Sequence, residues 1–269
     1  KSNPDVIFLH GSAYILPARF AALFSKRRSK IIVRETQANH LKTNIDWLYL
    51  ATAMLVADKM VYLSTEYKEQ VKAKWSWLYK EENSAMITND INLHTFKKSD
   101  AKKNNSLFLL GMQSRLISIK DHITLLDAFA MLLKKELPVK LHLLIAGEGE
   151  FKEVLIKHAA SLNISDKLTF TGMLEEKELV HFLHKLDIYI HASLGETMST
   201  AIMQAMACGK PIIASDVPGI NNMISNNQTG LLVPAKNAAA LSDAILQLIN
   251  NNQLAELLAG NAYTFATAN

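Results

Sequence analysis

Two cations, Arg115 and Lys120, follow a short apolar run, LFLLG, that predicts a β-strand. A loop carrying both can neutralise a diphosphate, because the guanidinium binds phosphate oxygens as a planar fork and the ammonium binds as a point charge. An ordinary solvated loop is the alternative explanation. The pair therefore indicates an anion site, provided that other residues of suitable chemistry lie beside it.

A second polar group follows the predicted strand IYIHAS and opens a Met- and Ala-rich helix pattern. Thr197, Met198 and Ser199 offer successive backbone N–H groups at a helix start, which is an arrangement that binds anions. Glu196 is a poor anion ligand, so we expect its carboxylate to accept hydrogen bonds from sugar hydroxyls; complementing the helix dipole is the alternative. Gln204 follows roughly 12 Å further along a helix, near the span from a sugar ring to a ribose across a diphosphate.

Glycine and histidine positions add weaker signals. The segment GEGEF places Gly147 after a predicted strand, which is typical of close approach to a ligand or of a tight turn, and the full dinucleotide fingerprint is absent. His191 ends a predicted strand near Glu196, so we expect it to line the cleft. His181 and His184 have no acidic or cysteine companions at ligand spacing, so no metal site is predicted.

These groups require a parallel sheet to bring them together. After residue 106, six short β-rich runs alternate with helix-length stretches, including amphipathic ones at 121–135 and 150–162. This alternation is typical of a doubly wound parallel sheet covered by helices, in which ligands bind at the carboxyl ends of the strands.

The first hundred residues show the same α/β alternation, with four strand-like runs and helical stretches at 16–28, 44–58 and 66–75. The polar segment 97–106 is the predicted linker. We therefore predict an α/β protein with two Rossmann-like domains, at 1–102 and 103–269.

Composition favours a soluble globular protein. The 269 residues are 49% hydrophobic and 20% charged, enough for a substantial core. The single cysteine, Cys208, favours a reducing compartment, provisionally the cytoplasm. The longest apolar run, at 47–57, is shorter than the roughly 20 residues of a membrane-spanning helix. Because the chain begins with Lys1 and its end, NAYTFATAN, adds no recognisable closing element, we expect a fragment.

Charge is divided unevenly along the chain. Residues 1–105 carry 17 Lys and Arg against 10 Asp and Glu, whereas residues 106–269 carry 12 against 15. In the basic half, KAKWSWLYK at 72–80 interleaves lysines with aromatic residues, and SKRRSK lies at 25–30. Such segments suit a peripheral contact with an anionic membrane, although buried aromatics and solvated cations explain them too. No nucleic-acid partner is expected.

In their order along the chain, these motifs resemble the retaining glycosyltransferases of family 4, which have the two-domain GT-B fold. RLISIK, with Arg115 and Lys120, is similar to the family's R-x4-K diphosphate clamp, and GEGE to its glycine turn. LTFTGML resembles the strand whose following loop, here around Met173, holds the nucleotide base. SLGETMSTAIMQAMACGKPIIASDVPGI resembles the donor signature with two glutamates separated by seven residues. Glu196 takes the first position, but Gln204 stands where the second glutamate grips the ribose.

The first half resembles the family less closely. TNDINLHTF at 88–96 is similar to the P-N-G-I-D-x3-F segment that ends the first domain. Glu35 and Thr36 stand where a catalytic histidine often follows the IIVRET strand. The expected acceptor-side residues are His10, Gly11, Arg34 and His40. Strands before DVIFLHG and a last helix that crosses back to the first domain are expected to be missing.

The resemblance implies a metal-independent retaining transferase that moves a sugar from a nucleotide-diphosphate sugar to a glycan or lipid-linked acceptor. It implies no cofactor, and a place in cell-surface polysaccharide biosynthesis, such as that of lipopolysaccharide, on the cytoplasmic face of the inner membrane. The implied catalytic residues are Arg115, Lys120 and Glu196, and the implied donor-binding residues are Gly147, Met173, His191, Thr197, Met198, Ser199 and Gln204. Two alternatives stay open, a non-catalytic nucleotide-sugar-binding homologue and a GT-B nucleotide-sugar epimerase.

Overall fold

The computed structural model describes residues 4–24, 29–99 and 107–268. The chain forms two compact units. The first contains residues 1–89 and the short segment Gly195–Met198, and the second contains Asp90–Leu194 and Ser199–Asn269. Residues 100–106 of the predicted linker lie outside the described residues, and the predicted boundary after residue 102 stays a prediction.

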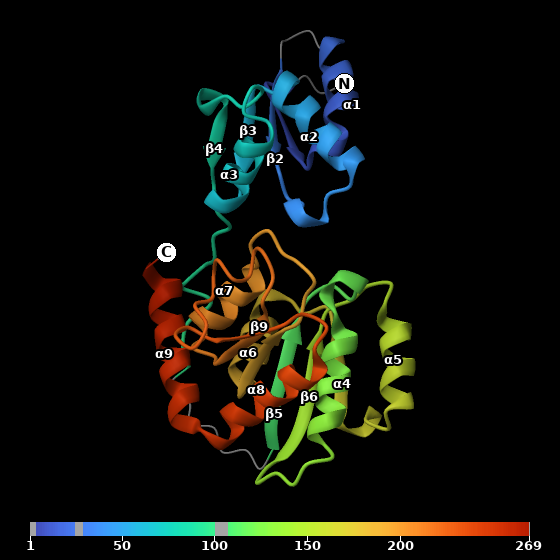
Figure 1. Ribbon diagram of the computed structural model, residues 1–269, viewed down its shortest axis with the longest axis vertical. Coiled ribbons are helices and arrows are strands. Elements are labelled where there is room, and N and C mark those ends of the chain that lie inside the picture. The colour runs from blue at the N-terminus through green and yellow to red at the C-terminus, as the bar shows by residue number, and fades with distance from the viewer. Residues whose placement is uncertain (1–3, 25–28, 100–106, 269) are drawn as a thin grey trace. The chain divides into compact units, whose positions relative to one another are not determined.

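The first unit is built on a four-stranded parallel sheet in the order β1-β2-β3-β4 (Figure 1). Alternation in KIIVR buries Ile31 and Val33 completely, and these side chains pack with helix residues such as Leu50. The elements are β1 (Val6–His10), α1 (Ile15–Leu23), β2 (Lys30–Arg34), α2 (Asn44–Val56), β3 (Lys59–Tyr62), α3 (Thr65–Lys74) and β4 (Ser84–Met86).

The second unit is built on a six-stranded parallel sheet in the order β10-β9-β8-β5-β6-β7 (Figure 1). Because β5 lies between β6 and β8, the chain reverses its direction across the sheet at this point, which is where ligands of open α/β sheets bind. Its elements are β5 (Leu107–Gln113), α4 (His122–Leu132), β6 (Lys140–Ala146), α5 (Lys152–Ser161), β7 (Leu168–Gly172), α6 (Glu176–Lys185), β8 (Ile188–His191), α7 (Thr200–Ala207), β9 (Ile212–Ser215), β10 (Leu231–Val233), α8 (Ala238–Asn250) and α9 (Asn252–Ala268).

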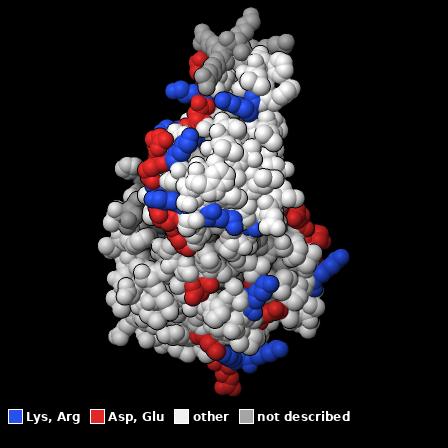
Figure 2. Space-filling view, turned by 45° about the horizontal axis from the view of Figure 1, so that its top comes forward, with Lys and Arg blue, Asp and Glu red and all other residues white. Residues whose placement is uncertain are grey.

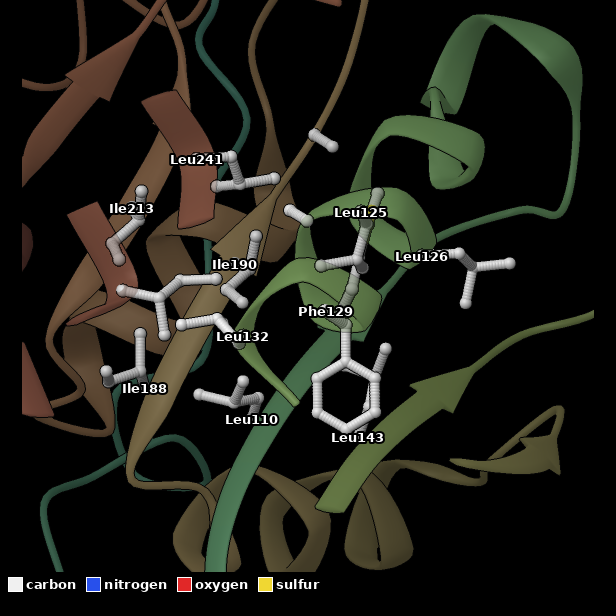
Figure 3. Close-up of a cluster of buried hydrophobic side chains, with 14 of the residues drawn as sticks. Leu110, Leu125, Leu126, Phe129, Leu132, Leu143, Ile188, Ile190, Ile213 and Leu241 are labelled. Carbon is white, nitrogen blue, oxygen red and sulfur yellow. The ribbon is translucent and has the colours of Figure 1, made fainter. Parts of the chain in front are cut away.

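Helix α4 provides much of the core of the second unit. Figure 3 shows apolar side chains of this helix, among them Leu125, Phe129 and Leu132, in one cluster with residues of the strands. Leu125, Phe129 and Leu132 are fully buried, as are Leu110 and Ile190 of the sheet. A helix that is apolar around most of its circumference suits a position covered on several sides, and α4 contacts both α5 and α8.

The ten sequence runs predicted as strands all overlap strands, and the five predicted helical stretches overlap α1 to α5. The C-terminal end differs from the expectation, because NAYTFATA belongs to α9, which packs on α7 and α8. Leu258, Ala262 and Ala266 of this helix are buried. Small alanines recurring every three or four residues conceal this buried stripe from a search for large apolar side chains.

The loops that follow β5 and β6 are joined through their main chains. The Ser114 N–H donates to the Ala146 carbonyl at 3.0 Å, and the Leu116 N–H donates to the Glu148 carbonyl at 2.9 Å. The register of the two parallel strands therefore continues into the loops, so that the position of one loop determines the position of the other.

Two glycines permit this approach. A Cβ atom on Gly147 would lie 1.9 Å from the Ser114 carbonyl oxygen, and one on Gly149 would lie 2.3 Å from the Leu116 carbonyl oxygen. Gly147 also has a φ of +134°, a conformation that residues with side chains rarely adopt. The glycine turn therefore serves a close approach between two segments of this chain.

We expect Gly147→Ala to lower the free energy of unfolding by at least about 2 kcal/mol, because the new methyl group collides with a main-chain oxygen that cannot rotate away. Gly260→Ala is the matched control, since a Cβ there meets open space in α9 and should change stability by no more than about 1 kcal/mol, in the stabilising direction. Urea denaturation of both variants measures the effects. Similar stability of the two variants would contradict the steric role of Gly147.

Candidate functional site

A pocket lies at the carboxyl ends of β5, β6 and β7. Three residues predicted from the sequence, Arg115, Gly147 and Met173, line it together with others that include Gln113, Leu174 and Leu179. The pocket thus combines a cation with an apolar wall. Such a wall suits a flat, weakly polar group, and the polar residues at its edge can set the orientation of that group.

The loop that carries the two predicted cations lies at the point where the sheet reverses direction. Arg115 is exposed and Lys120 is half-buried. The Leu194 N–H donates to the Ile119 carbonyl at 2.8 Å, which joins this loop to the one after β8. The loop is therefore held on one side by the β6 loop and on the other by the β8 loop.

His122, which the sequence analysis missed, begins α4 directly after this loop. It is 1% exposed, and its Nε2 lies 3.0 Å from the Ser114 hydroxyl oxygen. Burial, with smaller contributions from the charges of His191 and Lys120, lowers the pKa of His122 to about 4. The imidazole is therefore neutral at pH 7 and holds the residue before Arg115 without adding a charge.

His191 ends β8 as predicted, but its side chain is buried at 1% exposure. Its Nδ1 lies 3.1 Å from the Tyr189 hydroxyl oxygen and its Nε2 lies 3.4 Å from the Ser199 hydroxyl oxygen. Ser199 is the N-cap of α7, where its hydroxyl accepts a hydrogen bond from the Ile202 N–H. His191 therefore contacts the start of the predicted anion-binding helix.

The start of α7 is defined by that cap. Thr197 and Met198 precede the helix, and with Glu196 they belong to the segment grouped with the first unit. The Ser199 N–H donates to the Met223 sulfur at 3.3 Å. Because a thioether is a weak acceptor, this N–H has only a weak hydrogen-bond partner.

Gln204 lies on α7 and is half-buried. Its Oε1, the oxygen expected to hold a ribose hydroxyl, accepts a hydrogen bond from Nε2 of Gln113 at 3.2 Å. Gln113 is the last residue of β5, and the sequence analysis did not select it. Its position at the end of a strand could have identified it as a candidate site residue. Its contact with Gln204, 91 positions away, was not visible in the sequence.

In the first unit, the predicted residues His10, Gly11 and Arg34 meet at the carboxyl ends of β1 and β2. The Gly11 N–H donates to the Arg34 carbonyl at 2.8 Å, and the Arg34 guanidinium donates to the Asn89 side-chain oxygen. His40 lies further along the loop after β2 and is exposed.

Glu35, which stands where the family often has a histidine, is buried. Its carboxylate lies 3.4 Å from the ammonium of Lys42, and its other oxygen has no hydrogen-bond partner among the described residues. Burial lowers the pKa of Lys42, and the charge of Glu35 opposes that effect. This ion pair was missed because it joins residues on either side of an irregular loop.

Within the described ranges, no group of three or more His, Cys, Asp or Glu side chains is arranged to hold a metal ion. His184 has its Nε2 2.8 Å from the Lys97 carbonyl oxygen. None of the helices formed by the described residues is long and apolar enough to cross a membrane.

Two curated relatives cover about two thirds of this chain. Alpha-monoglucosyldiacylglycerol synthase of Streptococcus pneumoniae is 32% identical over 189 residues, covering 64% of this chain and 42% of the relative. Poly(ribitol-phosphate) alpha-N-acetylglucosaminyltransferase of Staphylococcus aureus is 27% identical over 175 residues, covering 65% and 34%. The chain thus spans less than half the length of either relative.

Comparison with a solved structure and with a family model addresses the fold and the family. The Anabaena protein Alr3699/HepE, in complex with UDP-glucose, has a TM-score of 0.82 over 98% of this chain and 74% of that protein, at 19% identity. The likeness shows the GT-B fold. The model of the family described as Glycosyl transferases group 1 matches residues 94–265, which include the pocket and α7. The chain therefore belongs to the glycosyl transferases group 1 family.

Proposed function

We propose that this chain carries the donor site of a retaining, metal-independent glycosyltransferase that moves a sugar from a nucleotide-diphosphate sugar to a glycan or lipid-linked acceptor. The observation that carries the proposal is the pocket at the ends of β5 to β7, where Arg115 adjoins an apolar wall. The wall takes the base and the guanidinium takes the diphosphate. UDP-glucose in the Anabaena protein, the glycolipid in the name of the Streptococcus relative and the poly(ribitol-phosphate) in the name of the Staphylococcus relative support this assignment.

In this proposal Arg115 and Lys120 stabilise the negative charge that develops on the leaving diphosphate, because preorganised cations act most strongly where charge appears in the transition state. Glu196 accepts hydrogen bonds from the donor sugar's hydroxyls. Backbone N–H groups of Thr197–Ser199 hold the β-phosphate or the sugar. Met173 lies beside the base, and Gly147 keeps the clamp loop in place.

We further propose that residues 103–269 form the donor domain and residues 1–102 the acceptor-side domain, where His10, Gly11, Arg34 and His40 meet the acceptor. The process served is cell-surface polysaccharide synthesis in the cytoplasm, beside the inner membrane. A non-catalytic nucleotide-sugar-binding homologue is the second candidate, and the neutral Gln204 in the position of the second glutamate favours it.

Calorimetric titration with a panel of nucleotide sugars, combined with a transfer assay read by mass spectrometry, tests the proposal. We expect one donor to bind and turn over.

Arg115→Ala and Lys120→Ala should each lower kcat/KM by about 10²-fold or more, since a preorganised transition-state donor contributes about 3 kcal/mol. Lys157→Ala, on the exposed face of α5, is the control. Activity within threefold of wild type in both clamp variants would contradict the clamp, and binding without turnover on any acceptor would favour the non-catalytic candidate.

The departure at Gln204 leads to a separate prediction. Gln204→Glu replaces a neutral amide by a carboxylate, which accepts hydrogen bonds from ribose hydroxyls more strongly because the bonds are charge-assisted. We expect the donor to bind about threefold to tenfold more tightly, by calorimetry. Gln247→Glu, on the exposed face of α8, controls for the added charge. Weaker binding in a folded Gln204→Glu protein would place the ribose elsewhere.

We also propose a peripheral membrane contact. In the structure, the aromatic residues of the segment 72–80 differ in burial. Trp75 and Tyr79 pack against the core, whereas Trp77 is 76% exposed. The ammonium of Lys74 lies 4.6 Å from the centre of the Trp47 ring. On the face shown in Figure 2, basic side chains lie among acidic ones. Residues 25–28 of the second basic segment are outside the described residues.

In flotation experiments we expect binding to vesicles with anionic lipid at low salt, and weaker binding as salt screens the charges. Changing Lys72, Lys74 and Lys80 together to Gln should reduce flotation. The same change at Lys134, Lys157 and Lys177, exposed lysines of the second unit, should not. If wild type stays in the soluble fraction, or both triple variants float equally, the membrane contact is wrong.

A further inference from the structure

We infer that Gln113 is a positioning residue that turns the side-chain amide of Gln204, so that Gln204 meets the donor's ribose with its N–H groups. The inference rests on the proposed function and deepens it. Nε2 of Gln113 donates to Oε1 of Gln204 across 3.2 Å, linking the end of β5 to α7. An amide whose oxygen is occupied in this way presents its NH2 group to the other side.

Burial favours this orientation of the pair over the reverse. Oε1 of Gln113 is buried and has no hydrogen-bond partner among the described residues. If both amides were reversed, the NH2 group of Gln113 would occupy that buried position without a partner. Buried N–H groups without a partner are rarer in proteins than buried carbonyl oxygens without one, which indicates that they are the less tolerated defect.

Gln113 is itself held in place from two sides. Its main chain pairs with Ala146 in the sheet, and the hydroxyl of Tyr189, a fully buried side chain, donates to its carbonyl at 3.3 Å. Its partner Gln204 is carried by α7, in which Met203 and Met206 are buried. The two amides therefore meet from elements whose positions are set by packing.

The chemistry of the pocket indicates which group of the nucleotide the Gln204 amide contacts. Gln113 lines the same pocket as Arg115 and the apolar residues Leu174 and Leu179. Gln204 is one hydrogen bond away from this pocket, through Gln113. In a nucleoside diphosphate the ribose joins the base to the phosphates, so an uncharged amide beside a pocket that has both an apolar wall and a cation suits a ribose hydroxyl. A hydroxyl oxygen accepts from the NH2 group, whereas a carboxylate in this position requires the hydroxyls to donate.

A double-mutant cycle with matched nucleotides tests the positioning role. Whichever of UDP, GDP and ADP binds wild type most tightly is compared by calorimetry with its 2′-deoxy and 3′-deoxy forms. We expect wild type to prefer the ribonucleotide over one deoxy form by about threefold to tenfold, the effect of one neutral hydrogen bond. Gln113→Met, similar in length but without the amide, should reduce that preference to less than about twofold.

In the Gln204→Met background, Gln113→Met should have no further effect on the preference, because Gln113 acts only through Gln204. Gln113→Leu gives a second variant should the first unfold. Gln247→Met, on the exposed face of α8, is the control that keeps the wild-type preference. Three results overturn the inference: a preference retained in Gln113→Met, equal weakening of both nucleotide forms, or an additive effect in the double variant. Failure of wild type to bind any nucleotide instead overturns the proposed function.

Discussion

The close approach of two main-chain segments, after β5 and β6, determines the geometry of the pocket. Ser114 and Leu116 donate to carbonyls of the neighbouring loop, and this is sterically permitted only because Gly147 and Gly149 lack side chains. Main-chain hydrogen bonds between segments of fixed register leave little freedom, so Arg115 extends from a rigid base. A cation placed in advance loses less conformational entropy when it binds an anion.

The polar groups behind this loop are buried. His122 is kept neutral by its burial, and His191 lies between the hydroxyl groups of Tyr189 and Ser199. A neutral His122 suits this position, because a buried charge without a partner is costly and would alter the field at the proposed phosphate site. Hydrogen bonds between such groups hold the strand ends and the cap of α7 without competing with Arg115 and Lys120 for an anion.

The position of the pocket follows from the strand order. Because β8 pairs with β5 rather than with β7, the loop after β5 lies between loops from both directions of the sheet. The hydrogen bond from Leu194 to Ile119 crosses that junction. The buried core beneath it, with Phe129 of α4 packed among strand residues, supports the strands from which the pocket residues extend.

Local patterns in the sequence were sufficient for the secondary structure and for several residues of the site. Short β-branched runs alternating with longer amphipathic stretches predict parallel α/β units because strand and helix periodicities differ, and each strand was found in this way. Arg115 and Gly147 were selected because a ligand at the carboxyl end of a parallel sheet must meet the residues directly after its strands, and Met173 was selected from the family resemblance; the structure places all three in the lining of one pocket. The alanine-rich α9 was missed, since small side chains give a weak periodic signal.

Only the tertiary structure decided which of these residues contact each other and which of their hydrogen-bonding atoms stay available for a ligand. The sequence left open whether the Gly-x-Gly turn approaches a ligand or only makes a tight turn, and the structure shows that it packs closely against the Arg115 loop. His191 looked like a cleft residue but is buried, and the oxygen of Gln204 is engaged by Gln113. Hydrogen bonds and burial depend on atoms that the fold brings together from distant parts of the chain. Residue types and spacing determine the kind of chemistry that is available, and packing determines which atoms remain to carry it out.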